Sequence, residues 1–133
     1  MAIKSIGIVG AGQMGNGIAH VLALAKYDVV LNDLTQDSLD AAIARIDKNM
    51  ERQVKGGKIT AAEKADALAR ITPSLALRDV AQSDLVIEAA TENEGIKQKI
   101  FDALLPDLKP ETILTSNTSS ISNRAKAHRK SFV

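Results

Sequence analysis

Short apolar runs alternate with longer amphipathic stretches along this chain. The runs typical of buried strands lie at residues 6–9, 29–31, 85–87 and 112–115, with a weaker one near Ile71. After the first run, apolar side chains recur at the spacing of one helix face, at Met14, Ile18, Val21, Leu22 and Ala25. Strands joined by helical crossovers predict an α/β fold with a doubly wound, mainly parallel sheet.

The segment after the second run is longer than one crossover needs. One face of a long helix is marked by Leu39, Ile43, Ile46, Met50 and Val54. Gly56-Gly57 ends this helix. Thr60 and Glu63 form a capping-box pattern, which predicts a further helix through about Ala69. A pair of helices is therefore expected before the weak strand near Ile71.

The last part of the pattern predicts one more helix and one more strand. The helix is expected from Ile96 to Leu108, closed by Pro110, and the strand follows at residues 112–115. A length of 133 residues, with 45% hydrophobic and 25% charged residues, is typical of one soluble globular domain. Such a domain buries roughly 65 to 70% of the surface of its unfolded chain.

Composition excludes several kinds of function. Aromatic side chains are few and the net charge is +1, so neither base stacking nor general attraction to nucleic acid is expected. The chain has no cysteine, and His20 and His128 lie far apart, so no metal site is expected. No apolar run is long enough for a membrane span or a signal peptide, which makes the cytoplasm the default location. His20 is interpreted as a packing or surface residue.

A glycine-rich turn stands between the first strand and the first helix, in the order Gly10-Ala11-Gly12-Gln13-Met14-Gly15. Gly10 permits the tight turn, Gly12 allows a pyrophosphate to approach the backbone, and Gly15 allows close packing of helix and strand. The amides at the start of the helix then face the phosphates. Glycine-rich turns also occur for purely local reasons, so this motif alone leaves both interpretations open.

Asp33 ends the second strand, at the position where a carboxylate accepts hydrogen bonds from the adenosine ribose of a dinucleotide. Its charge would repel a 2′-phosphate, and Leu34-Thr35 supply no arginine to offset that repulsion. The sequence therefore favours NAD over NADP. The alternative is that Asp33 is a turn residue or a helix cap.

Two further motifs stand where later strands end. Glu88-Ala89-Ala90-Thr91-Glu92, followed by Lys97, is the first, and Ser116-Asn117-Thr118-Ser119-Ser120 is the second. Together with residues 10–19 they resemble the 3-hydroxyacyl-CoA dehydrogenase family, and within it the bacterial 3-hydroxybutyryl-CoA dehydrogenases. The resemblance covers residues 1–122 and implies a Rossmann-like NAD-binding domain. Other NAD-dependent families with the same glycine motif, of the 3-hydroxyisobutyrate or 6-phosphogluconate type, lack a matching serine-rich run.

The resemblance also implies roles for single residues. Glu92 and Lys97 would contact the cofactor, Asn117 would lie beside the nicotinamide ribose, and Ser119 would hydrogen-bond the 3-oxygen of the substrate. With the earlier motifs, the expected cofactor contacts are Gly10, Gly12, Gln13, Met14, Gly15, Asp33, Glu92, Lys97 and Asn117. The alternatives are a solvated charge pair for Glu92 and Lys97 and a hydroxyl-rich capping turn for residues 116–120.

The long helix carries a stripe of basic side chains opposite its apolar face, at Arg45, Lys48, Arg52 and Lys55, with Lys58 following in the loop. Such a stripe can hold the phosphates of coenzyme A. In the family resembled this region does contact the coenzyme, and Asn49 falls at one of the contacting positions. The substrate candidates are therefore Asn49, Arg52, Lys55 and Ser119. A solvated basic face is the alternative.

The match to the family pattern stops after residue 122. The family continues into a Gly-x-His-Phe-x-Asn-Pro segment, whose histidine is the general base, and into a helical domain; His128 lacks those flanking residues. We expect residues 1–122 to form the NAD-binding domain, residues 123–133 to form a flexible basic tail, and the C-terminal helical domain to be absent. NAD(H) binding is then expected with little or no turnover, which leaves open whether the chain alone is an enzyme. The alternative is a nucleotide-binding or interaction module that self-associates through the exposed strand at 112–115.

Overall fold

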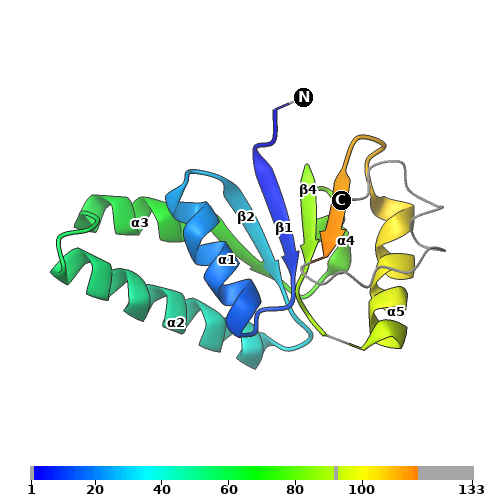
Figure 1. The fold of residues 1–133 in the computed structure, drawn as a ribbon, viewed down its shortest axis with the longest axis horizontal. Helices are drawn as coiled ribbons and strands as arrows, with labels where there is room; N and C mark the ends of the chain where they lie inside the picture. The colour runs from blue at the N-terminus through cyan, green and yellow to red at the C-terminus, as the bar shows by residue number, and fades with distance from the viewer. Residues whose placement is uncertain (1, 92, 117–133) are drawn as a thin grey trace.

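A computed structural model describes residues 2–91 and 93–116 of the chain. The strands are β1 (Ser5–Val9), β2 (Asp28–Asn32), β3 (Ile71–Ser74), β4 (Leu85–Glu88) and β5 (Ile113–Ser116). The helices are α1 (Gln13–Leu24), α2 (Gln36–Lys55), α3 (Ala61–Ala69), α4 (Leu77–Ala81), α5 (Glu94–Leu104) and the 3₁₀ turn η1 (Leu105–Asp107). The five strands form one parallel sheet in the order β3-β2-β1-β4-β5 (Figure 1).

Helices cover the sheet on two faces, as the alternation of side chains along each strand requires. Ile6 and Ile8 of β1 pack with buried residues of α1, α2 and α3 in one core. Val9, on the opposite face, packs with α4, α5 and buried residues of β4 and β5 in the other. The α2–α3 hairpin extends away from the sheet (Figure 1). The expected doubly wound, Rossmann-like architecture is confirmed.

The order of the strands reverses between β1 and β4. From β1 the chain runs outward to β2 and β3, and then crosses back to β4 on the other side of β1. The register pairs Val9 with both Asn32 and Glu88, so the three strands end at the same level. In open parallel sheets, ligands bind in the crevice beyond the carboxyl ends at this kind of reversal. The fold therefore places any nucleotide site at the turns that follow β1, β2 and β4.

The predicted helical pair is confirmed. The hydroxyl of Thr35 caps α2 by accepting a hydrogen bond from the Ser38 amide at 3.1 Å. Thr60 and Glu63 make the reciprocal capping box at the start of α3, with bonds of 2.8 and 3.0 Å. The capping box of Thr60 and Glu63 was predicted, because its two residues lie only three positions apart, whereas the Thr35 cap was not predicted.

Two boundaries differ from the predicted ones. The helix expected from Ile96 to Leu108 begins earlier, at Glu94, and its α-helical part ends at Leu104. A 3₁₀ turn containing Pro106 follows, because proline has no amide hydrogen with which to continue the α-helical ladder. The short helix α4 was not predicted, since its five residues are too few to show a periodicity.

The amino end of the sheet is fastened by Asp84, which directly precedes β4. Its carboxylate accepts hydrogen bonds from the backbone amides of Lys4 and Ser5, at 2.9 and 3.2 Å, and pairs with the Lys109 ammonium at 3.0 Å. The Lys4 amide, followed by Lys109 and the Ser5 amide, lowers the pKa of Asp84 to about 2. This carboxylate therefore stays ionised well into the acid range and holds the start of β1 against β4.

No helix within the described residues is both long enough and apolar enough to cross a membrane.

Gly15 and Gly17 both lie on α1 but in different surroundings, and they provide a matched test of the packing of this helix. A Cβ atom on Gly15 would overlap the carbonyl oxygen of Gly10, whereas a Cβ atom on the exposed Gly17 would meet nothing within 4 Å. We expect Gly15→Ala to lower the free energy of unfolding by about 3 kcal/mol. Gly17→Ala should raise it by roughly 0.5 to 1 kcal/mol through helix propensity. Urea denaturation of both variants measures the difference, and equal stabilities would contradict this packing.

Candidate functional site

The turn after β1 is shaped by Gly10. Its φ of +104° lies in the region that favours glycine, and its amide donates to the carbonyl oxygen of Asn32 at 2.8 Å. A Cβ atom at Gly10 would lie only 2.6 Å from the Cα atom of Ala90. The turn therefore packs backbone to backbone against the segment that follows β4, with no room for a side chain between them.

The amino end of α1 faces open space. Gly12 is the N-cap residue and supplies no side chain to the first helical amides, and a Cβ atom there would meet nothing within 4 Å. No acidic residue stands in the first turn of the helix. Gln13 and Met14 begin the helix and are exposed. A helix start with this geometry favours an anionic group such as a pyrophosphate.

Asp33 follows β2 and reaches back to the glycine-rich turn. Its carboxylate accepts hydrogen bonds from the Ala11 amide at 3.1 Å and from the Leu34 amide at 2.7 Å. Beside it lies a hollow of about 200 Å³, lined by Ala11, Gly12, Asp33, Ser38, Ala41, Ala42 and Arg45. The proposal that Asp33 is a helix cap is wrong, because Thr35 caps α2. Asp33 instead joins the turn after β1 to the end of β2 and borders the hollow.

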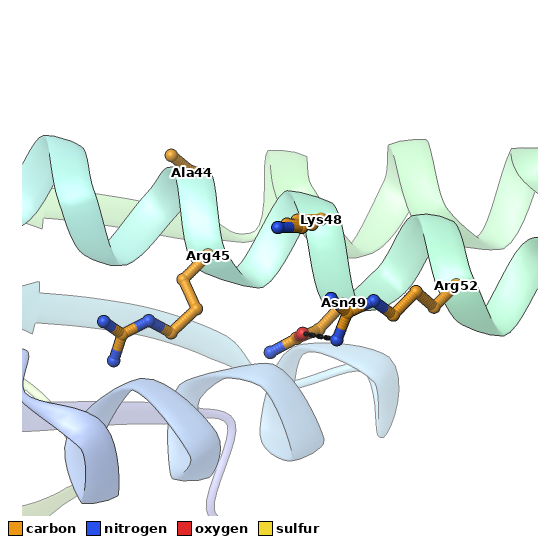
Figure 2. Close-up of a pocket in the computed structure, with 5 residues that line it drawn as sticks. All are labelled: Ala44, Arg45, Lys48, Asn49 and Arg52. Carbon is orange, nitrogen blue, oxygen red and sulfur yellow. Dashed lines mark hydrogen bonds between the residues drawn. The ribbon is translucent and has the colours of Figure 1, made fainter.

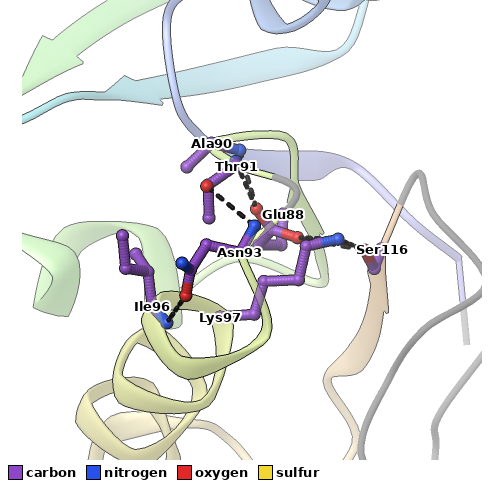
Figure 3. Close-up of polar contacts among 7 residues, drawn as sticks. All are labelled: Glu88, Ala90, Thr91, Asn93, Ile96, Lys97 and Ser116. Atoms are coloured by element: carbon purple, nitrogen blue, oxygen red, sulfur yellow. Dashed lines mark hydrogen bonds and ion pairs between the residues drawn. The ribbon is translucent and has the colours of Figure 1, made fainter.

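A buried ion pair lies beneath the carboxyl ends of β4 and β5 (Figure 3). The Glu88 and Lys97 side chains are 0% and 1% exposed, and Lys97 Nζ lies 3.4 Å from Glu88 Oε1. The Ser116 hydroxyl at the end of β5 donates to the same oxygen at 3.0 Å, and Lys97 Nζ lies 3.4 Å from Ser116 Oγ. A solvated charge pair is therefore wrong for Lys97. Glu92, the other expected member of that pair, lies outside the described residues.

The second oxygen of Glu88 holds the segment that follows β4. Oε2 accepts hydrogen bonds from the amides of Ala90 at 2.7 Å and Thr91 at 3.3 Å. Thr91 Oγ1 then accepts from the Asn93 amide at 3.0 Å, and Asn93 Oδ1 caps α5 through the Ile96 amide at 3.0 Å. Sequence reasoning gave Glu88 no role, although an acidic residue that ends an apolar run directly before Ala89-Ala90 is a detectable signal.

The basic side chains of α2 surround a shallow surface pocket of about 420 Å³, lined by Ala44, Arg45, Lys48, Asn49 and Arg52 (Figure 2). Arg52 Nη1 donates to Asn49 Oδ1 at 3.4 Å. The next hollow along the helix adds Lys55 together with two acidic residues, Asp47 and Glu51. Those two carboxylates pair with Lys64 of α3, at 2.7 and 2.8 Å. The side chains of Arg45, Lys48 and Arg52 thus form a positive surface, and the two neighbouring acids are paired with Lys64.

The other sequence candidates fall into two groups. His20 Nε2 lies 2.7 Å from Gln53 Oε1, which joins α1 to α2 and fits a packing role. Asn117, Ser119 and His128 lie outside the described residues, as does most of the serine-rich run. The structure therefore brings together the glycine-rich turn, Asp33 and the Glu88–Lys97 pair at one end of the sheet. The basic surface of α2 adjoins that group at Arg45, which lines both the hollow beside Asp33 and the pocket on α2.

Comparison with known proteins identifies the family. A model of the NAD binding domain of 3-hydroxyacyl-CoA dehydrogenase matches residues 5–130. The chain belongs to this family. Its cofactor is accordingly NAD, as the sequence predicted, and the other NAD-dependent families considered are excluded. The open amide surface at Gly12 and the carboxylate of Asp33 fit the two parts of NAD that they would hold, the pyrophosphate and the adenosine ribose.

Individual relatives agree with this assignment. The 3-hydroxybutyryl-CoA dehydrogenase of Bradyrhizobium diazoefficiens is 54% identical over 120 residues, which are 90% of this chain and 41% of the relative. A probable 3-hydroxybutyryl-CoA dehydrogenase of Deinococcus radiodurans is 46% identical over 115 residues, covering 86% of this chain and 41% of that protein. The crystal structure of (S)-3-hydroxybutyryl-CoA dehydrogenase from Ralstonia eutropha superposes with a TM-score of 0.91 at 40% identity, over 98% of this chain and 48% of that one. The chain thus spans less than half the length of these relatives.

Proposed function

We propose that the crevice beyond β1, β2 and β4 binds NAD(H) through the residues that the sequence singled out. Asp33 accepts hydrogen bonds from the adenosine ribose, and the backbone at Gly12, Gln13 and Met14 receives the pyrophosphate. Gly10 and Gly15 act indirectly, because they allow the turn to pack closely. The observation that carries this proposal is the open backbone at Gly12 beside a carboxylate that borders a hollow.

The nicotinamide half of the site is proposed to lie beyond β4 and β5. By resemblance to the family, Glu92, Lys97 and Asn117 serve the cofactor there and Ser119 contacts the 3-oxygen of the substrate. The Lys97 ammonium is buried at the ends of these strands, so we propose that it acts from beneath the cofactor and not from the open surface. A hydroxyl at the position of Ser119 can donate to a ketone and accept from an alcohol.

The relatives' names suggest the reaction of a complete protein of this type. We propose that it oxidises a 3-hydroxyacyl-CoA to the 3-ketoacyl-CoA in the cytoplasm. Bound NAD would accept the hydride from C3 of the substrate, and the histidine that is the family's general base would accept the proton of the 3-hydroxyl. The contribution of residues 1–116 to that reaction is to bind the cofactor and to fix its orientation at the sheet edge.

A calorimetric titration with NADH tests the cofactor site directly. We expect the chain to bind NADH more tightly than NADPH, because the Asp33 carboxylate repels a 2′-phosphate. Asp33→Ala should weaken NADH binding by about tenfold or more, since it removes charged hydrogen bonds to the ribose. Asp28→Ala, at the exposed amino end of the same strand, is the matched control and should leave the affinity unchanged. Equal NADH affinities for the two variants would contradict the role of Asp33.

The basic surface of α2 is proposed to receive the phosphates of an acyl-CoA. Three cationic side chains line the pocket there, and Asn49 stands among them. We expect Lys48→Ala combined with Arg52→Ala to weaken coenzyme A binding by roughly tenfold at low salt, with a smaller effect at high salt. Arg78→Ala combined with Lys99→Ala removes two exposed cations from α4 and α5 and serves as the control. If both double variants bind coenzyme A equally in fluorescence titrations, the basic surface of α2 does not bind the coenzyme and is a solvated face.

A second candidate function is self-association through β5. In the described part of the chain β5 pairs with β4 on one side only, and exposed strand edges invite pairing with another chain. We expect light scattering to show a mass that rises with protein concentration. A constant monomer mass over the whole concentration range would contradict this proposal.

A further inference from the structure

The buried carboxylate of Glu88 is not the main link between the strands. β4 already pairs with β1 and β5 through its backbone, and the core beside it is filled by apolar residues. A buried ion pair is in general no more stabilising than apolar side chains of the same size. The position of Glu88 at the end of β4, directly beneath the crevice, therefore calls for a different explanation.

The explanation lies in what the two carboxylate oxygens bind. Oε2 accepts from the amides of Ala90 and Thr91, so it turns both amides inward, away from the crevice. Oε1 binds the Lys97 ammonium and the Ser116 hydroxyl, which come from α5 and from the end of β5. The Glu88 side chain thus links three segments to one another: the backbone after β4, helix α5 and the end of β5 (Figure 3).

The segment fixed by Glu88 is also the one that meets the glycine-rich turn. A Cβ atom on Gly10 would lie 2.6 Å from Ala90 Cα and 2.8 Å from the Ala90 nitrogen. Because even one added carbon would overlap Ala90, the backbone of residue 90 lies directly against the turn after β1, and a displacement of Ala90 would change the packing of that turn. Glu88 is therefore linked to the crevice in two steps: its hydrogen bond with the Ala90 amide, and the backbone packing of Ala90 against Gly10.

We propose that Glu88 is a positioning residue for the nicotinamide half of the NAD site, acting through the backbone of residues 89–91. The inference rests on the proposed NAD(H) site and deepens it. Glu88 itself does not contact the cofactor, because its side chain is fully buried. Its hydrogen bonds with the amides of Ala90 and Thr91 determine the position of the backbone that lines the crevice between the glycine-rich turn and the end of β5.

Two double variants separate this role from a purely structural one. The amide variant, Glu88→Gln with Lys97→Met, removes both charges but keeps an oxygen that can accept from Ala90 and Thr91, and an amide that can donate to Ser116. The apolar variant, Glu88→Met with Lys97→Met, removes both charges and the acceptor as well. Because neither variant leaves a buried charge unpaired, both avoid the largest cost of a single substitution.

Calorimetry with NADH and with ADP, which carries the adenosine and the diphosphate but no nicotinamide, provides the measurement. We expect the apolar variant to bind NADH about tenfold more weakly than the amide variant, and ADP within about threefold of it. Equal NADH affinities, or an equal loss for NADH and ADP, would overturn the inference. Binding of NADH by the wild-type chain separately decides the proposed function, and its absence would overturn both.

Amide hydrogen exchange in the wild-type chain gives a second test that does not depend on the folding of any variant. If Glu88 holds the segment, the Ala90 and Thr91 amides exchange slowly, on the timescale of the buried strand amides of β4. Exchange as fast as that of an open loop would show that the carboxylate does not hold them, and the inference would fall.

Discussion

The close approach of three backbone segments at Gly10 is the constraint on which the rest of this domain depends. The turn after β1, the start of α1 and the segment after β4 meet there without a side chain between them. Gly10 and Gly15 are the residues that make this approach possible, because a single methyl group at either position would overlap neighbouring backbone. Close packing leaves the first amides of α1 at the floor of the crevice, where a phosphate can reach them.

Asp33, beside the crevice, and Glu88, beneath it, act in different ways. Asp33 lies at the surface of a hollow and reaches the turn through the Ala11 amide, so it can serve both the backbone and a ligand. Glu88 is fully buried, and its acceptor positions are taken by backbone amides, a hydroxyl and an ammonium. Asp33 is thus available to a ligand, whereas Glu88 holds the backbone after β4 in place. Both carboxylates nevertheless lie at the carboxyl ends of strands in the same sheet.

Much of this arrangement can be predicted from the sequence because its signals are local. The capping box of Thr60 and Glu63 and the glycine spacing each lie within a few residues, and the apolar runs locate all five strands. The burial of Lys97 could not be predicted, since it depends on Glu88 and Ser116, which approach it only in the folded sheet. The end of α5 was misplaced for a simpler reason: Pro106 stops the helix before Pro110 is reached.

Asp84 and Glu88 lie at opposite ends of β4, and together they determine the register of that strand. Asp84 binds the start of β1 and Lys109, and Glu88 binds the segment after β4 and the end of β5. A slip of β4 by one residue would break both sets of bonds and turn Val86 out of its core. The strand is therefore fixed along its own length at both ends. A ligand that binds in the crevice therefore meets a central strand whose register is already set from both of its ends.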